Sequence, residues 1–205
     1  MKKILLVLSF LIIPSLSLFA AERTLELTLT SNYVFRGDTQ TGDKAAVQAN
    51  YTWMPGENAG FYAGFFASNV SQGAEVDVFG GIKLPLGSLI LDFGAVEYMY
   101  TDSNFKDFSH EFYASVQYDL TYLKYSFGEN EATYLDVGTG FKVFSDMELL
   151  LHYGEVFVAG NPGGNDYSVS LQKEITNVNV GVTATYEDKA PTKDSEIFAF
   201  ISLDY

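Results

Sequence analysis

The chain has 205 residues, of which 26 are acidic and 12 basic, and it contains no cysteine. The acidic balance argues against nucleic acid as a partner, because binding to phosphates requires basic side chains. Without cysteine the fold takes no stability from disulfides. The 14 tyrosines and 17 phenylalanines stand against one tryptophan, a composition that suits β-strands with aromatic rings at a membrane interface.

The first 20 residues have the pattern of an export signal. Lys2 and Lys3 precede an apolar run over residues 4–13, and small residues follow at Ala20 and Ala21. This pattern predicts a signal peptide over residues 1–20, because the run is too short to span a bilayer as a helix. A buried N-terminal helix is the alternative. Residues 21–205 then form a single domain, and loss of the two lysines leaves 26 acidic against 10 basic residues.

Apolar and polar residues alternate with a period of two directly after the signal, as in a strand with one apolar face. The first predicted strand runs to Arg36. A second strand covers residues 44–53, and the turn-forming residues 54–58 end it. The apolar face of the first strand comprises Leu25, Leu27, Leu29, Tyr33 and Phe35, and its polar face comprises Thr24, Glu26, Thr28, Thr30, Asn32 and Arg36.

Ten further strands are predicted near residues 59–68, 75–83, 88–99, 110–118, 121–128, 132–141, 146–154, 165–173, 178–187 and 196–205. The alternation is less regular in two of them, since Glu97 and Leu150 fall on the faces opposite to those expected. After the signal no stretch approaches the roughly 20 apolar residues of a membrane helix. About twelve strands therefore predict an all-β fold, a closed antiparallel transmembrane β-barrel in which every backbone group is paired.

The links between the predicted strands alternate between short and long. A tight turn at residues 119–120, for example, follows a long segment at residues 101–109. In outer-membrane barrels the short turns face the periplasm and the long loops face outward. The pattern predicts a protein of the cell outer membrane with both termini in the periplasm. A soluble lipocalin-like barrel would also alternate, but it needs fewer strands.

The C-terminus ends in an alternating apolar set with a final aromatic residue. Ile201, Leu203 and Tyr205 continue the face of Ile197 and Ala199. This ending resembles the signal by which the barrel-assembly machinery recognises outer-membrane barrels, so that machinery is an expected partner. A soluble protein could end in this way by chance.

Several short segments resemble those of a known protein family. They are residues 31–37 (Ser-Asn-Tyr-Val-Phe-Arg-Gly), 39–41, 46–48, 60–64, 68–70, 75–81 and 152–154. These segments resemble the TorF-type porins, a bacterial family of outer-membrane barrels long catalogued as a conserved hypothetical family. The resemblance is sharpest over residues 25–83. It implies an outer-membrane barrel, and it adds more about location than about substrate.

The polar faces of the predicted strands are expected to line the lumen, and their acidic excess predicts a pore that favours cations. Arg36, expected at the outer mouth, either narrows the pore and selects ions or pairs with a neighbouring wall carboxylate and seals the interior. Tyr62, Phe66 and Phe79 are expected to occupy part of the narrow bore. The candidate lumen residues are Glu26, Arg36, Lys44, Glu75, Asp77, Lys83, Glu111, Lys124, Asp136, Glu148 and His152.

No catalytic residue, cofactor or metal site is predicted. Nucleophilic catalysis needs a nucleophile and a base within hydrogen-bond reach, and no motif ties Ser109, Ser145 or Ser168 to His110 or His152. The predicted function is therefore passive diffusion of small polar solutes or ions across the outer membrane, with outer-membrane lipid and lipopolysaccharide as surroundings. The alternative is a structural or surface-interaction barrel with a filled lumen.

Overall fold

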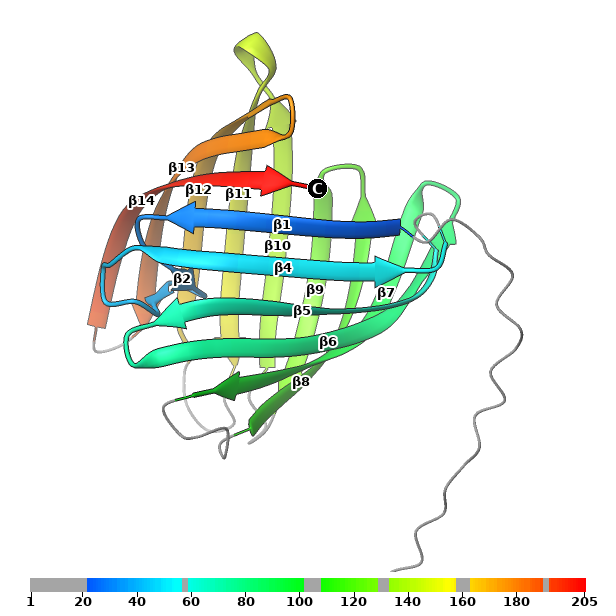
Figure 1. Cartoon of the computed structure of the whole chain (residues 1–205), viewed down its shortest axis with the longest axis horizontal. Coiled ribbons are helices and arrows are strands. Elements are labelled where there is room, and N and C mark those ends of the chain that lie inside the picture. The colour runs from blue at the N-terminus through cyan, green and yellow to red at the C-terminus, as the bar shows by residue number, and fades with distance from the viewer. Residues whose placement is uncertain (1–21, 57–58, 102–107, 129–132, 158–162, 190–191) are drawn as a thin grey trace, which may run out of the picture.

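The computed structural model describes residues 22–56, 59–101, 108–128, 133–157, 163–189 and 192–205, so the predicted signal peptide lies outside the described residues. Twelve long strands form one closed antiparallel barrel, in which β1 pairs with both β4 and β14 (Figure 1). The prediction of a closed antiparallel barrel of about twelve strands is confirmed. The strands are β1 (Glu22–Thr30), β4 (Ala46–Met54), β5 (Gly60–Val70), β6 (Gly73–Leu86), β7 (Leu89–Tyr100), β8 (Phe108–Tyr118), β9 (Thr121–Gly128), β10 (Thr133–Lys142), β11 (Met147–Phe157), β12 (Asn165–Ile175), β13 (Val178–Lys189) and β14 (Thr192–Asp204).

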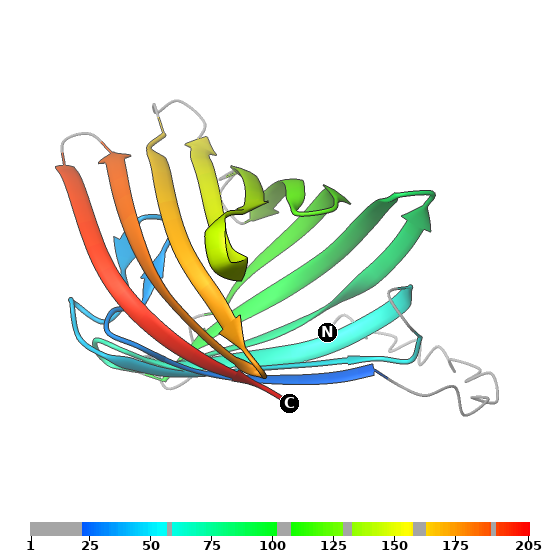
Figure 2. The same ribbon diagram turned by 90° about the horizontal axis from the view of Figure 1, so that it is seen from above.

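The strands are steeply tilted, as closure of a barrel requires. In Figure 1 the front strands β1, β4 and β5 run across the view, while β10 to β12 on the far wall run nearly perpendicular to them. In the perpendicular view, β12 to β14 rise away from β1 and β4 (Figure 2). The end at which β1 begins and β14 ends is called here the terminal end. The opposite end, where β1 ends and β4 begins, is called the loop end.

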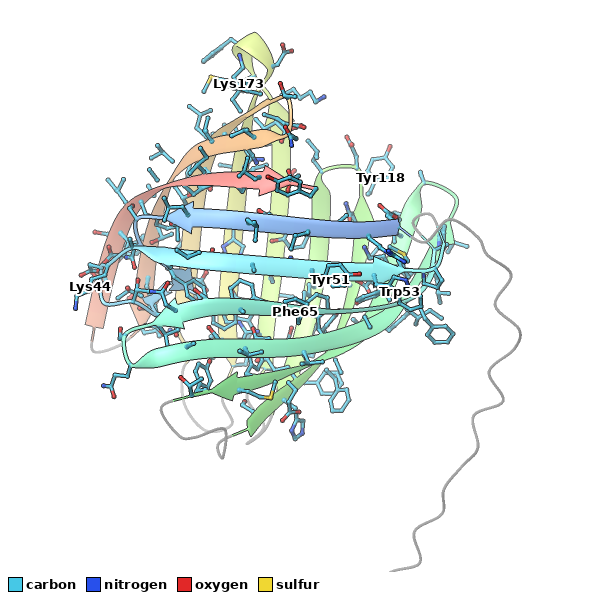
Figure 3. The ribbon with its side chains drawn as sticks, in the orientation of Figure 1. Lys44, Tyr51, Trp53, Phe65, Tyr118 and Lys173 are labelled. Atoms are coloured by element: carbon cyan, nitrogen blue, oxygen red, sulfur yellow. The ribbon has the colours of Figure 1, made fainter. Side chains whose placement is uncertain are left out.

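The wall has its polar side chains inside and its apolar side chains outside. Ile197 and Phe61 point outward and are 76% and 70% exposed, whereas Glu75 and Asp77 point inward and are 2% and 6% exposed. Tyr51, with Trp53 on the same strand face, packs its ring 5.6 Å from that of Phe65 on the outer surface (Figure 3). A soluble protein hides its apolar residues from water, so this reversed distribution suits a barrel surrounded by lipid. In the part of the chain that the structure describes, no helix is long and apolar enough to cross a membrane.

The prediction that the first strand continues in the barrel wall as far as Arg36 is wrong. β1 ends at Thr30, whose hydroxyl donates to the carbonyl oxygen of Asn32 at 2.7 Å. The chain then leaves the wall, so Tyr33 and Phe35 do not continue its lipid-facing side. β4 begins only at Ala46, opposite Thr30. Lys44, expected on a lumen-facing strand, lies before β4 and is exposed at the loop end (Figure 3).

Aromatic rings lie against the inner wall over glycines of neighbouring strands. A Cβ atom on Gly64 would lie 2.5 Å from the ring of Phe79, and one on Gly81 would lie 2.5 Å from the hydroxyl of Tyr62. The rings fill the space that side chains at these glycines would need. The rings of Tyr62 and Phe79 thus occupy space inside the barrel, next to its wall.

Candidate functional site in the barrel lumen

A short hairpin formed by residues 31–41, called here the luminal hairpin, turns into the barrel at the loop end. Its strands β2 (Val34–Phe35) and β3 (Asp38–Thr39) are two residues long. Arg36 and Gly37 form the turn between them, with φ of 52° and 87°. A two-residue turn with both φ values positive is the usual connection of a tight hairpin, and glycine adopts such a φ without steric cost.

The base of the hairpin is fastened by the buried side chain of Asn32, which is 4% exposed. Its amide oxygen accepts hydrogen bonds from the hydroxyls of Thr39 at 2.7 Å and Thr41 at 2.9 Å. Its amide nitrogen donates to Asp43 and to Glu196 of β14, each at 3.2 Å. One side chain thus joins both arms of the hairpin to the wall.

The tip of the hairpin reaches the opposite wall. The two terminal guanidinium nitrogens of Arg36 donate to the two carboxylate oxygens of Glu111 on β8, each at 2.7 Å. The guanidinium also lies 4.1 Å from the ring centroid of Tyr134 and 4.7 Å from that of Phe35. Lys189 of β13 donates to Asp38 at 2.5 Å. The hairpin therefore crosses the lumen.

Arg36 remains charged in this position. Burial alone would lower its pKa, but the hydrogen bonds and the ion pair with Glu111 outweigh burial, so the pKa of Arg36 lies above its ordinary value. The turn carries Arg36 into the lumen, and its partners Glu111 and Tyr134 lie near the loop-end starts of β8 and β10. Its place at the outer mouth stays a prediction. Of the two roles considered for Arg36, the geometry shows pairing with a wall carboxylate, and the partner lies on β8 rather than on a neighbouring strand.

The hairpin separates two cavities in the lumen. The larger has a volume of 610 Å³ and the smaller 210 Å³, and Val34, Phe35, Tyr98 and Lys124 line both. The ammonium of Lys124 lies 4.3 Å from the ring centroid of Tyr113. A third cavity of 310 Å³ opens between β10, β11, β12 and β13 at the terminal end. The lumen is thus partly filled and partly open.

One row of inward side chains forms the wall of the larger cavity. Glu26 lies opposite Asn50, Asn50 opposite Phe66, Phe66 opposite Asp77, and Asp77 opposite Tyr98 in the strand register. All five line this cavity. The row places the Asp77 carboxylate between two aromatic residues.

The hairpin adds aromatic rings to this row. The ring of Tyr33 lies 5.7 Å from that of Phe66, and the ring of Phe35 lies 6.1 Å from that of Tyr98. Burial, followed by the charge of Glu75, raises the pKa of the Tyr33 hydroxyl, so Tyr33 stays neutral. The larger cavity therefore has an aromatic lining made partly by the wall and partly by the hairpin.

A second cluster surrounds His152 on β11. Its Nε2 lies 3.0 Å from Asp136 and its Nδ1 lies 3.4 Å from Asp166. Ser168 stands opposite His152 in the strand register, which the sequence did not suggest. Both ring nitrogens face carboxylates, so neither is positioned to take a proton from Ser168. His110 lies on the outer face, 5.9 Å from the ring centroid of Phe112.

Two acidic residues that are not among the candidate lumen residues also belong to the inner wall. Asp166 and Glu187 point inward from β12 and β13 and are each 4% exposed. The two residues pair with each other in the ladder of these strands, and β13 continues to Lys189, two residues beyond its predicted end. These carboxylates face the tip of the hairpin.

The remaining candidate lumen residues have identifiable surroundings. Glu75 accepts a hydrogen bond from the Tyr100 hydroxyl at 2.8 Å, and Glu148 accepts one from Gln172 at 3.2 Å. The ammonium of Lys83 lies 5.6 Å from the ring centroid of Tyr62. These residues point inward from β6 and β11, at different heights from the hairpin.

The C-terminal set expected to guide assembly lies on the outer face of β14. Ile201 is 43% exposed and Tyr205 is 67% exposed, while Leu203 pairs with Leu27 across the seam. The backbones of Tyr205 and Leu25 exchange hydrogen bonds of 2.9 and 3.0 Å. The last residue thus takes part in closing the barrel.

A closed barrel of twelve antiparallel strands with an apolar outer face and a polar, charged lumen is a transmembrane β-barrel. The chain belongs to the family described as "Bacterial protein of unknown function (Gcw_chp)", whose model matches residues 20–200. No curated protein matches the sequence.

Solved structures of porins share the fold. The KdgM porin in complex with disordered oligogalacturonate has a TM-score of 0.62 and 8% sequence identity, and the match covers 90% of this chain and 98% of that chain. The NanC porin has a TM-score of 0.62 and 11% identity, with 88% of this chain and 98% of that chain covered. At these identities the similarity shows the fold, which is that of small outer-membrane porins.

Proposed function

We propose that this protein is a channel of the bacterial outer membrane through which small polar solutes or ions diffuse passively. The observation that carries this proposal is the polar, partly open lumen inside a wall with an apolar outer face. The porin fold and the resemblance of residues 25–83 to TorF-type porins support it. The signal peptide over residues 1–20 directs export, the barrel-assembly machinery inserts the chain, and lipid and lipopolysaccharide surround it.

In this proposal the terminal end faces the periplasm and the loop end faces outward. Short turns such as the one between Leu86 and Leu89 lie at the terminal end. The longer connections, including the one that forms the luminal hairpin, lie at the loop end. This arrangement is the usual one for single-chain bacterial barrels.

The lumen favours cations. The three cavities are lined by six carboxylates and three lysine or arginine side chains, together with His152. An acidic lining raises the local concentration of cations and repels anions. The KdgM porin was captured with oligogalacturonate, which carries carboxylates. The lining of this chain opposes passage of such a polyanion.

The test is single-channel conductance of the folded, purified protein in planar bilayers under a salt gradient. Discrete current steps are expected, with a reversal potential that shows cation preference. Glu26→Lys should move the reversal potential toward anions, because Glu26 lines the larger cavity. The exposed Asp188→Lys should change it less, since that carboxylate pairs with Lys193 at the loop end. Anion preference in the unmodified protein would contradict the proposal.

The alternative is a structural or surface-interaction barrel with a closed lumen, and the luminal hairpin favours it. Arg36 ties the hairpin to the Glu111 carboxylate on β8, and Asp38 of the hairpin pairs with Lys189 on β13. A folded, heat-modifiable barrel that gives no current steps would support this alternative over the channel.

A further inference from the structure

The larger cavity contains a buried carboxylate oxygen to which none of the described residues donates a hydrogen bond. Asp77 is 6% exposed and lines the cavity. Among the described residues, no hydrogen bond reaches its Oδ1 atom. A buried carboxylate oxygen is costly unless a donor or a positive charge compensates it. The position therefore suits a ligand with a positive group.

Aromatic rings surround this carboxylate. Phe66 and Tyr98 are its direct neighbours on the adjoining strands, and Tyr33 and Phe35 of the hairpin pack against these two rings at 5.7 and 6.1 Å. Aromatic faces attract cations within about 6 Å of the ring centroid, and boxes of such rings are used to hold quaternary ammonium groups.

The chain's own cations already occupy comparable places. Arg36 lies over Tyr134, and Lys124 lies over Tyr113 at 4.3 Å in the wall of the larger cavity. Luminal cations in this barrel thus rest on aromatic faces beside carboxylates. A diffusing organic cation would meet the same kind of surface next to Asp77.

We propose that the larger cavity is a binding site for a small organic cation of the quaternary or methylated ammonium class, held by Asp77 and by the rings of Tyr33, Phe66 and Tyr98. The volume of 610 Å³ falls within the usual range of small-molecule sites. Metal ions fit less well, since in the described part of the chain no three His, Asp or Glu side chains are placed so that they could hold a metal ion together. This inference names the solute class of the proposed channel and rests on that function.

The binding test is isothermal titration calorimetry of the full-length folded barrel in detergent with tetramethylammonium chloride. Ionic strength is held constant with sodium chloride, so that charge screening does not change. Saturable binding with one site per chain is expected. Galacturonate and glucose serve as anionic and neutral probes and should give no saturable heat.

Two variants and one control test whether tetramethylammonium binds in the larger cavity. Asp77→Asn keeps the shape of the side chain but removes its charge, and Phe66→Leu removes one ring. Each should weaken tetramethylammonium binding about tenfold, the usual size of one desolvated cation contact. Asp188→Asn is the matched control, because Asp188 is exposed and lies outside the cavity.

Channel recordings of the same preparations separate the two proposals. Current steps without saturable tetramethylammonium binding would overturn the site and leave the channel. Binding without current steps would overturn the channel and leave the site. If the unmodified protein and its Asp77→Asn and Phe66→Leu variants bind tetramethylammonium equally well, the cation binds elsewhere and the proposed site is overturned. The site is also overturned if glucose or galacturonate binds saturably and Asp77→Asn weakens that binding as much as it weakens tetramethylammonium binding.

Discussion

The barrel wall and the luminal hairpin are stabilised by different kinds of interaction. In the wall, backbone ladders run along whole strands, as β13 and β14 show by pairing continuously over Val178 to Lys189. In the hairpin, only two residue pairs join β2 and β3. Its position depends on side chains, chiefly Asn32 at the base and Arg36 at the tip. The difference indicates that the hairpin can be altered while the wall remains folded.

Removal of the hairpin should give the largest effect. The backbone nitrogen of Gln40 donates to the carbonyl oxygen of Tyr33 at 2.7 Å. The two arms are therefore close at the base, and two glycines can replace residues 33–40. The smaller and larger cavities would then merge, and single-channel conductance should rise about two- to fivefold, because the hairpin no longer narrows the bore.

The wall should fold without the hairpin. The variant in which two glycines replace residues 33–40 should keep a heat-modifiable band on electrophoresis and a β-rich circular dichroism spectrum, since no wall strand includes these residues. A variant that fails to form a barrel would show that the hairpin is part of the folding unit. Unchanged conductance in a folded variant would show that the hairpin does not limit passage.

Arginine substitutions on the outward and inward faces of β12 test which face of the wall meets lipid and which meets the lumen. Val169 of β12 points outward and is 49% exposed, while Gln172 points inward and lines the terminal-end cavity. Val169→Arg should lower the free energy of unfolding by about 2–4 kcal/mol, the usual cost of arginine on a lipid-facing surface. Gln172→Arg should cost less than about 1 kcal/mol, because water and Glu148 are near. Urea unfolding from lipid vesicles measures both, and equal losses would contradict the assigned faces.

The wall could be predicted from the sequence because its period-two pattern has a direct physical cause. Lipid on one side and a polar lumen on the other fix the character of alternate residues, and the limited span of a bilayer fixes strand length. The number of strands and most of their bounds follow from these two constraints. Glu97, an acidic residue that the alternation places on the otherwise apolar face of its strand, does face outward, beside His110.

The luminal hairpin could not be predicted because its residues continue the same pattern. Tyr33 and Phe35 extend the alternation of β1, and only the three-dimensional position of Glu111, distant in the sequence, makes an inward Arg36 favourable. The Arg36-Gly37 pair followed by polar residues was the available signal of a turn. Alternation likewise predicts that Asp77 and Tyr98 face inward, but their adjacency depends on the strand register.

The anchor of the hairpin is tested by a double-mutant cycle of Arg36→Met and Glu111→Gln. The two side chains are 20% and 16% exposed and form two hydrogen bonds of 2.7 Å. A coupling of about 1–3 kcal/mol in the free energy of unfolding is expected for a charge-assisted contact of this kind. The exposed pair Lys193 and Asp188 is the control and should couple by less than about 0.5 kcal/mol. Equal couplings would mean that the hairpin tip adds no stability.

The smallest effect concerns the fit of aromatic rings against the inner wall. Gly81→Ala would place a Cβ atom 2.5 Å from the hydroxyl of Tyr62 and equally close to the backbone oxygen of Phe93. The Tyr62 hydroxyl also donates to Asp92 at 2.8 Å. The ring must move into the lumen and the β7 backbone must shift slightly, with a loss of about 1 kcal/mol or more in the free energy of unfolding. The displaced ring should lower the conductance. In the outward-facing Gly80→Ala the closest contact is looser, at 3.1 Å from a backbone oxygen. Gly80→Ala should therefore leave conductance unchanged, and a similar drop in both variants would show that backbone strain, not the displaced ring, is the cause.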